Sequence, residues 1–150
     1  MKKIILILYF GIISCSNINN PNKEVNKSEI DSIEYFKKRV INIGDTIAYN
    51  KISLHYTFNL VPWPLLFYSQ IMCNKYKYPF ACYDCYLIYA EKYTGENLKA
   101  NDSLSKNFGI YYLLKAKEMG YKEAQDELKD VFRNSKIPTA SDYLKIHISE

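Results

Sequence analysis

The chain has 150 residues, of which 48% are hydrophobic and 24% charged, and this composition excludes a disordered protein and favours one globular domain. Its formal net charge is +4; without Lys2 and Lys3, which belong to an expected leader, 18 basic residues remain against 16 acidic ones. Because no basic block stands out, the sequence argues against nucleic acid as a partner.

Residues 1–14 have the pattern of a signal peptide. Lys2 and Lys3 precede an apolar run from Ile4 to Ile13, which is too short to span a bilayer as a lasting helix. The run ends in Ile12-Ile13-Ser14-Cys15, which resembles the lipobox of bacterial lipoproteins. This resemblance implies that Cys15 becomes the lipidated first residue of the mature protein. The alternative is an ordinary secretory leader in which Cys15 is incidental.

Residues 15–27 predict a lipidated Cys followed by a flexible tether, because the segment is polar, has one Pro and shows no apolar periodicity. It lacks the acidic run that marks surface export in some bacterial lipoproteins, which favours the periplasm-facing leaflet. We therefore expect a lipid-anchored protein of the bacterial cell envelope, at the outer membrane, that faces the periplasm or the cell surface.

The rest of the chain predicts an all-α domain over residues 28–138 and a tail helix within residues 139–150. Apolar residues recur at helical spacing, and capping residues, Gly and Pro separate the segments. We expect helices at about 28–43, 45–56, 64–75, 79–92, 105–119, 121–133 and 141–146. A longer loop precedes the fifth helix.

Three short segments of this domain resemble one another: GDTIAYNKI at 44–52, KYPFACYDC at 77–85 and GYKEAQDEL at 120–128. Their starts lie 33 and 43 residues apart, a period typical of stacked helix pairs that cannot bury their apolar faces alone. The equivalent positions are the turn residues Gly44, Lys77 and Gly120, the later Ala48, Ala81 and Ala124, then Ile52, Cys85 and Leu128, and the earlier Val40, Cys73 and Ala116. Small residues allow two antiparallel helices to approach closely, and Gly ends a helix with a positive φ. Lys77 departs from this rule and predicts a strained or differently shaped turn.

The last of these units resembles the Sel-one-like repeat, a relative of the tetratricopeptide repeat, through Ala116, Gly120, Ala124 and Leu128 with Tyr112 upstream. The resemblance is partial at 64–92 and faint at 28–57. It implies a short right-handed α-solenoid of about three antiparallel helix pairs plus a short C-terminal helix. Proteins of this family grip partners on a concave face, and they share no catalytic residues.

The cysteines of the second unit allow three interpretations. A thioredoxin-like motif would need a β-strand before Cys82-Tyr-Asp-Cys85, and zinc would need a second ligand pair; the sequence offers neither. We favour Cys73 and Cys85 as unpaired core residues, since free Cys packs as a small hydrophobe. A disulfide from Cys73 to Cys82 or Cys85 is the alternative, and a redox or metal function is the third.

Tyr83, Tyr86, Tyr89 and Tyr93 recur at helical spacing, which favours packing against the next helix pair over an aromatic binding stripe. The sequence has no Gly-rich phosphate loop, no Ser nucleophile motif and no paired His. We therefore expect no catalytic residue, no metal, no cofactor and no small-molecule substrate.

The leading hypothesis from the sequence is a membrane-anchored module that binds a protein or a peptide. A narrower version is an immunity protein against a secreted toxin, and the alternative is a structural envelope lipoprotein or an accessory to a cell-envelope enzyme. A groove lined by the first helix of each pair would hold the partner. The candidate contact residues are Tyr35, Gln70, Asn74, Tyr111 and Lys115, which the core does not need.

Overall fold

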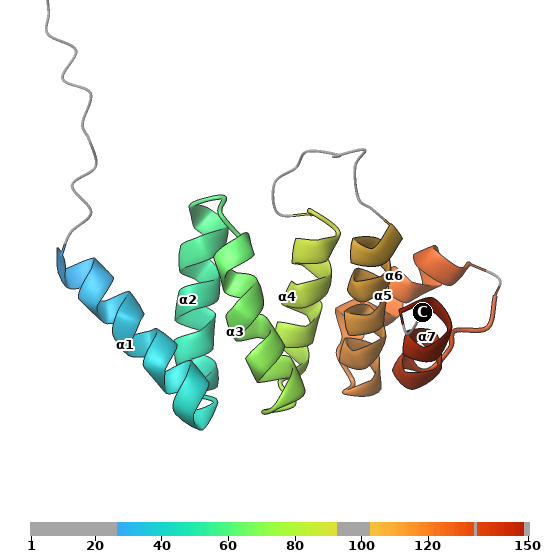
Figure 1. The fold of residues 1–150 in the computed structure, drawn as a ribbon, viewed down its shortest axis with the longest axis horizontal. Helices are drawn as coiled ribbons and strands as arrows, with labels where there is room; N and C mark the ends of the chain where they lie inside the picture. The colour runs from blue at the N-terminus through green and yellow to red at the C-terminus, as the bar shows by residue number, and fades with distance from the viewer. Residues whose placement is uncertain (1–26, 93–102, 134, 149–150) are drawn as a thin grey trace, which may run out of the picture.

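The computed structural model describes residues 27–92, 103–133 and 135–148, and this part of the chain is entirely helical (Figure 1). It contains seven helices and no strand: α1 Lys27–Ile43, α2 Thr46–Phe58, α3 Trp63–Asn74, α4 Pro79–Tyr89, α5 Ser103–Glu118, α6 Lys122–Phe132 and α7 Ala140–His147. The all-α class expected from the sequence is confirmed. None of the described helices is both long and apolar enough to cross a membrane.

Local sequence explains where the helices start. Asp45 caps α2, because its carboxylate accepts hydrogen bonds from the amides of Ile47 and Ala48 at 2.9 and 3.0 Å. Thr139 caps α7 in the same way through the amide of Asp142. Helices α3 and α4 instead begin with Pro in the first turn, where the missing amide hydrogen costs no helical hydrogen bond.

Several helices end on a residue with a positive φ. Gly44 and Gly120 have φ values of 65° and 86°, as expected for Gly at these turns, and Lys77 has a φ of 55°. A non-Gly side chain in this region is strained, so the unusual turn expected at Lys77 is observed. Glu91 has a φ of 54°, and the amide of Lys92 bonds back to the carbonyl of Leu87. This arrangement ends α4 at Tyr89, three residues before the expected end at Lys92.

The described helices enclose two clusters of buried residues. We call the cluster made by α1 to α4 the first core; it contains Val40, Ala48, Tyr49, Ile52, Leu65, Met72, Ala81 and Ile88. The second core is made by α3 to α7 and contains Cys73, Cys82, Cys85, Tyr86, Tyr112, Leu113, Leu114, Ala116, Ala124, Leu128, Ala140 and Tyr143. Helices α3 and α4 contribute to both cores, so they join the two halves of the described domain.

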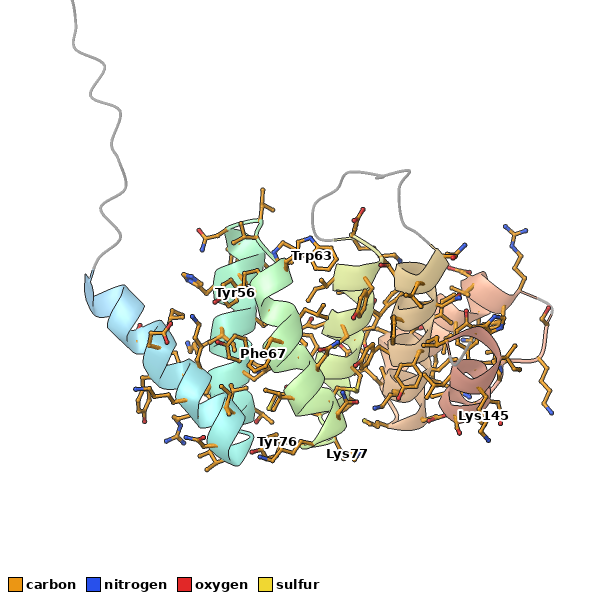
Figure 2. All side chains as sticks on the ribbon, viewed as in Figure 1. Tyr56, Trp63, Phe67, Tyr76, Lys77 and Lys145 are labelled. Atoms are coloured by element: carbon orange, nitrogen blue, oxygen red, sulfur yellow. A yellow bond between two sulfur atoms is a disulfide. The ribbon has the colours of Figure 1, made fainter. Side chains whose placement is uncertain are left out.

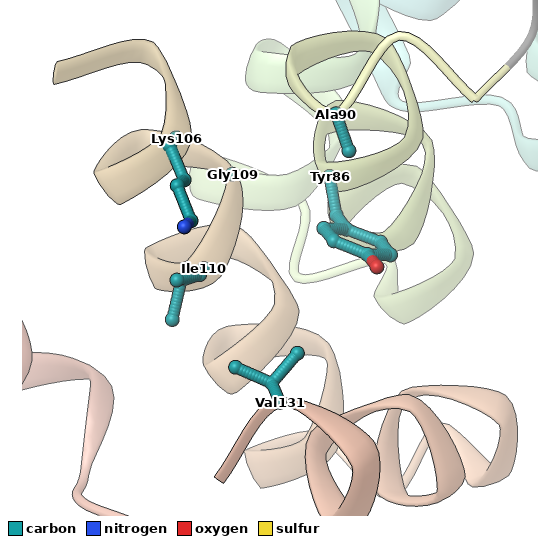
Figure 3. Close-up of a pocket in the computed structure, with 6 residues that line it drawn as sticks. All are labelled: Tyr86, Ala90, Lys106, Gly109, Ile110 and Val131. Carbon is teal, nitrogen blue, oxygen red and sulfur yellow. The ribbon is translucent and has the colours of Figure 1, made fainter. Parts of the chain in front are cut away.

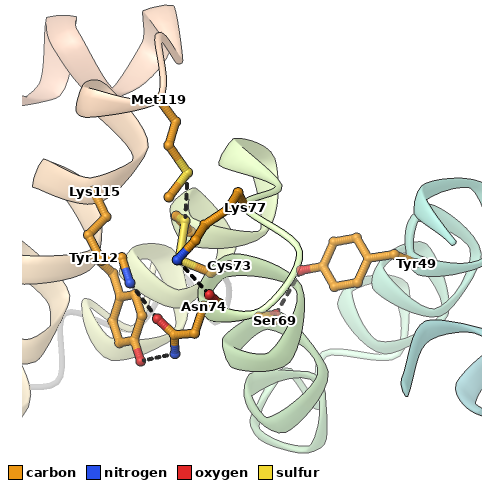
Figure 4. Close-up of a disulfide and its surroundings, with 9 residues drawn as sticks. Tyr49, Ser69, Cys73, Asn74, Lys77, Tyr112, Lys115 and Met119 are labelled. Carbon is orange, nitrogen blue, oxygen red and sulfur yellow. Dashed lines mark hydrogen bonds between the residues drawn. A yellow bond between two sulfur atoms is a disulfide. The ribbon is translucent and has the colours of Figure 1, made fainter. Parts of the chain in front are cut away.

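The interpretation of Cys73 as an unpaired core residue is wrong. Cys73 near the end of α3 and Cys82 in the first turn of α4 form a disulfide with a Cα–Cα distance of 4.8 Å (Figure 4). The short turn between the two helices brings these residues into bonding range, which the spacing alone left open. Cys85 is unpaired and fully buried, and burial raises the pKa of its thiol well above the usual value. Cys73, Cys82 and Cys85 therefore all lie in the second core, and of these three only Cys85 is a free thiol.

Several expectations lie outside the described residues. They concern the signal peptide at 1–14, Cys15 and the tether up to residue 26, Tyr93, and the loop before α5 up to residue 102.

Candidate interaction surface

Four of the five candidate contact residues lie together where α3 meets α5. Gln70 and Asn74 are one turn apart on α3, and Tyr111 and Lys115 are one turn apart on α5. Each pair therefore lies on one side of its helix. We call these four residues, with Phe67, the α3–α5 face.

Hydrogen bonds connect the two helices of this face (Figure 4). The Asn74 Nδ2 group donates to the Tyr112 hydroxyl at 3.3 Å, and the Lys115 ammonium group donates to Asn74 Oδ1. The same ammonium group lies 5.3 Å from the ring centroid of Tyr111 and 5.7 Å from that of Tyr112. Asn74 and Lys115 are thus positioned by each other and by two aromatic rings.

Stacked aromatic rings of α4 and α5 pack beside the α3–α5 face. Tyr89 of α4 stacks on Tyr112 with ring centroids 6.1 Å apart, and on Phe108 with centroids 5.8 Å apart. Its hydroxyl accepts a hydrogen bond from the Gln70 side chain at 3.2 Å. Tyr83 packs on Tyr121 and on Tyr86. These contacts confirm the packing role expected for Tyr83, Tyr86 and Tyr89.

Lys115 is the main electrostatic feature of the face. Burial lowers the pKa of its ammonium group below the usual value, and burial raises the pKa of the neighbouring Tyr112 to about 12. No described Asp or Glu forms an ion pair with Lys115. A half-buried cation between aromatic rings attracts a carboxylate, because the surroundings screen the attraction less than water does.

Tyr35 does not belong to this face. Its described contacts are with Phe36, at a ring-centroid distance of 5.7 Å, and with Arg39, which donates to the Tyr35 hydroxyl at 3.2 Å. All three residues lie on α1. The structure therefore separates Tyr35 from the other four candidates.

Phe67 belongs to the face, although the sequence-based selection missed it. Its side chain is 57% exposed on α3 (Figure 2), three residues before Gln70 and seven before Asn74. This spacing places all three residues on one side of the helix. The same spacing is visible in the sequence, but the candidate contact residues selected there do not include Phe67.

A second group that the sequence-based selection missed is a buried polar cluster around Asp84. The Tyr49 hydroxyl donates to the Asp84 carboxylate at 2.6 Å, and the Ser53 hydroxyl donates to it at 3.0 Å. Tyr49 also contacts the Ser69 hydroxyl at 2.7 Å. Asp84 is fully buried, so these hydroxyls replace the water that its carboxylate loses. The cluster joins α2, α3 and α4, and the signal for it was an acidic residue between the expected core residues Ala81 and Ile88.

A pocket of about 220 Å³ lies between α4, α5 and the end of α6 (Figure 3). Its lining residues are Tyr86, Ala90, Lys106, Gly109, Ile110 and Val131. The lining is mostly apolar and contains no His, Cys or carboxylate, and its titratable side chains are Tyr86 and Lys106. Among the described residues, no three His, Cys, Asp or Glu side chains are grouped closely enough to hold a metal ion.

Comparisons with known proteins identify no relative: no protein-family model, no curated protein and no solved structure matches the chain.

Proposed function

We propose that the protein is a membrane-anchored interaction module of the bacterial envelope, and that the α3–α5 face binds a protein or peptide that presents a carboxylate. The observation that carries this proposal is the clustering of Gln70, Asn74, Tyr111 and Lys115 beside the exposed Phe67. An exposed ring supplies apolar contact area, and the amides and the ammonium group supply directional hydrogen bonds.

The proposed architecture behind this face is a short right-handed α-solenoid of the Sel-one-like kind. Helices α1–α2, α3–α4 and α5–α6 would form three antiparallel pairs, with α7 after the last pair. Two observations support it: the turn residues Gly44, Lys77 and Gly120 share a positive φ, and the equivalent helix positions are at most 1% exposed. Those positions are Val40, Cys73, Ala116, Ala48, Ala81, Ala124, Ile52, Cys85 and Leu128.

Cys15 supplies the proposed anchor, through the resemblance of Ile12-Ile13-Ser14-Cys15 to a lipobox. Binding of a secreted toxin, as in an immunity protein, is the narrower form of the proposal. Acyl labelling and membrane fractionation of wild type and Cys15→Ala test the anchor on its own. An unlabelled wild-type chain that leaves the membrane fraction contradicts it.

The binding face is tested by affinity capture from envelope extracts, followed by a titration with the captured partner. We expect the double variant Gln70→Ala/Tyr111→Ala to weaken binding by about tenfold or more, because residues at the centre of an interface carry most of the binding energy. The matched control is Gln125→Ala/Tyr35→Ala, which removes the same residue types away from the face.

Both double variants must retain wild-type circular dichroism and urea midpoints, so that a loss of binding reports the face. Equal affinities of the two double variants would show that the partner binds elsewhere. Failure to capture any specific partner would contradict the interaction module itself.

A further inference from the structure

The turn between α2 and α3 exposes four large apolar side chains within six residues. Phe58 is 82% exposed, Leu60 66%, Val61 50% and Trp63 51%. We call these four residues the turn patch. Lone exposed apolar residues are ordinary, but a continuous group of this kind marks a surface that something covers.

The backbone of this turn is suited to an apolar environment. The amides of Asn59, Leu60 and Val61 donate to the carbonyls of His55, Thr57 and Tyr56. Pro62 and Pro64 have no amide hydrogen to satisfy. The segment 58–63 contains no charged residue, and the side-chain amide of its only polar residue donates to the carbonyl of His55 at 2.7 Å. Apolar surroundings require this internal pairing of donors, because they supply no water to replace it.

Leu60 combines a strained backbone with an exposed apolar side chain. It has a φ of 55° at a helix end where Gly is the usual residue, because a Cβ is strained in this conformation. Burial does not compensate this strain, since Leu60 is one of the most exposed large apolar residues described. Lys77, Glu91 and Arg133 share this positive φ at other helix ends, so what distinguishes Leu60 is the large apolar side chain that it leaves exposed.

The turn patch lies near the end of α1 from which the N-terminal segment leaves. Ile33 and Phe36 of α1 line an open groove of about 340 Å³ with Leu54 and Phe58 of α2, so Phe58 lies level with the second turn of α1. Helix α1 begins at Lys27, six residues before Ile33, which corresponds to about 9 Å along the helix. The start of α1 and the α2–α3 turn occupy the same edge of the row of helices (Figure 1).

We propose that the turn patch inserts into the interface of the bilayer to which Cys15 anchors the chain. Eleven residues separate Cys15 from Lys27, and a chain of this length reaches at most roughly 40 Å. The anchor would therefore hold the edge with Phe58 and Trp63 within reach of the lipid surface. Trp and Phe suit this position, because their rings prefer the boundary between head groups and acyl chains. The inference rests on the proposed anchor, and it orients the α3–α5 face relative to the membrane.

Trp63 is the only tryptophan of the chain, so its fluorescence reports the turn patch directly. The full chain is bound to phosphatidylethanolamine–phosphatidylglycerol vesicles, with or without bromine on the acyl chains. We expect a blue shift of the Trp63 emission on binding and a loss of most of this emission in brominated vesicles. The double variant Phe58→Ser/Leu60→Gly should lose the shift and the quenching, and its urea midpoint should not fall, since Gly relieves the strain at residue 60.

The control variant is Ile146→Ser, which removes a 63% exposed side chain from α7 at the other end of the row of helices. It should keep the wild-type quenching. A chain that sediments with vesicles while Trp63 is neither shifted nor quenched contradicts the turn patch but not the anchor. A chain that does not sediment with them contradicts both. A blue shift that grows with protein concentration without vesicles would assign the patch to a second copy of the chain and overturn the proposal.

Discussion

The two cores of this domain are held together by different means. In the first core, the Asp84 carboxylate binds the hydroxyls of Tyr49 and Ser53 where α2, α3 and α4 meet. In the second core, the Cys73–Cys82 disulfide joins α3 to α4, and Met119, in the turn after α5, contacts the Cys82 sulfur at a sulfur–sulfur distance of 3.7 Å. The first core thus depends on directional hydrogen bonds and the second on a covalent bond.

This difference separates the conditions under which each core weakens. Buried hydrogen bonds to a carboxylate select one packing arrangement, because any other arrangement leaves polar groups unpaired in an apolar surrounding. A disulfide mainly limits the freedom of the unfolded chain, so its contribution disappears on reduction. The first core should therefore respond to mutation of its polar groups, and the second to reductant.

The largest effect is expected from removing the centre of the polar cluster. Asp84→Ala leaves two buried hydroxyls without their acceptor and should lower the free energy of unfolding by about 3–5 kcal/mol. The exposed Asp126, which pairs with Lys129 at 2.8 Å, provides the control, because Asp126→Ala removes only a solvent-screened ion pair and should leave the urea midpoint nearly unchanged. Urea unfolding measures both variants. Similar midpoints for the two would mean that the cluster does not stabilise the first core.

The next effect concerns the disulfide. The double variant Cys73→Ala/Cys82→Ala should lose about 2–3 kcal/mol, the value expected for a cross-link between residues nine positions apart. Reductant should lower the free energy of unfolding of wild type to that of this variant and should not change that of the variant. It should lower the free energy of unfolding of Asp84→Ala by the same amount as that of wild type. Urea curves with and without reductant test this. A wild-type protein that is insensitive to reductant argues against the bond.

A matched pair of glycines compares the turns beside the two cores. A Cβ at Gly44 would lie 2.3 Å from the Tyr76 ring, whereas a Cβ at Gly120 would meet nothing within 4 Å. Both glycines have a positive φ, so Gly120→Ala should cost about 1 kcal/mol from backbone strain alone. Gly44→Ala should cost about 2–3 kcal/mol, since the ring must also move. Equal losses in thermal or urea unfolding would show that the Tyr76 ring yields freely.

The effect that is smallest at neutral pH is a change in the slope of stability against pH in the alkaline range. Burial raises the pKa of Tyr112 to about 12, whereas an unfolded Tyr titrates near 10. Above about pH 10 the unfolded chain binds fewer protons than the folded one, so stability is complete below this pH and falls as pH rises to the folded pKa. Tyr112→Phe should reduce the fall by up to about 1.4 kcal/mol per pH unit. Urea midpoints of wild type and Tyr112→Phe, measured between about pH 10 and pH 12, test this prediction. The same dependence of stability on pH in both proteins would contradict a raised pKa for Tyr112.

The helices could be predicted from the sequence because their signals are local. Asp45 as a cap, Pro64 and Pro79 in first turns, and Gly44 and Gly120 at helix ends act on neighbouring residues. The expected helices match the observed ones to within a few residues. The end of α4 was missed because Glu91 adopts a conformation that its residue type rarely takes.

The candidate site was predicted less completely because it depends on contacts between distant residues. Gln70, Asn74, Tyr111 and Lys115 were found as polar or aromatic residues outside the apolar periodicity, whereas Tyr35 passed the same test and lies elsewhere. The choice of Cys82 over Cys85 as the partner of Cys73 depends on the turn geometry between two helices. Periodicity specifies which side of a helix is buried, but not which neighbour it meets.

The hydrogen bond between Tyr49 and Asp84 limits the order in which the chain can fold. The two residues are 35 positions apart, and α3 lies between them in the sequence. The hydroxyls of Tyr49 and Ser53 on α2 therefore lack their Asp84 acceptor until α4 has been synthesised and has docked. A chain that ends before α4 should remain a loose helical intermediate, so the first four helices form one cooperative folding unit rather than two independent pairs.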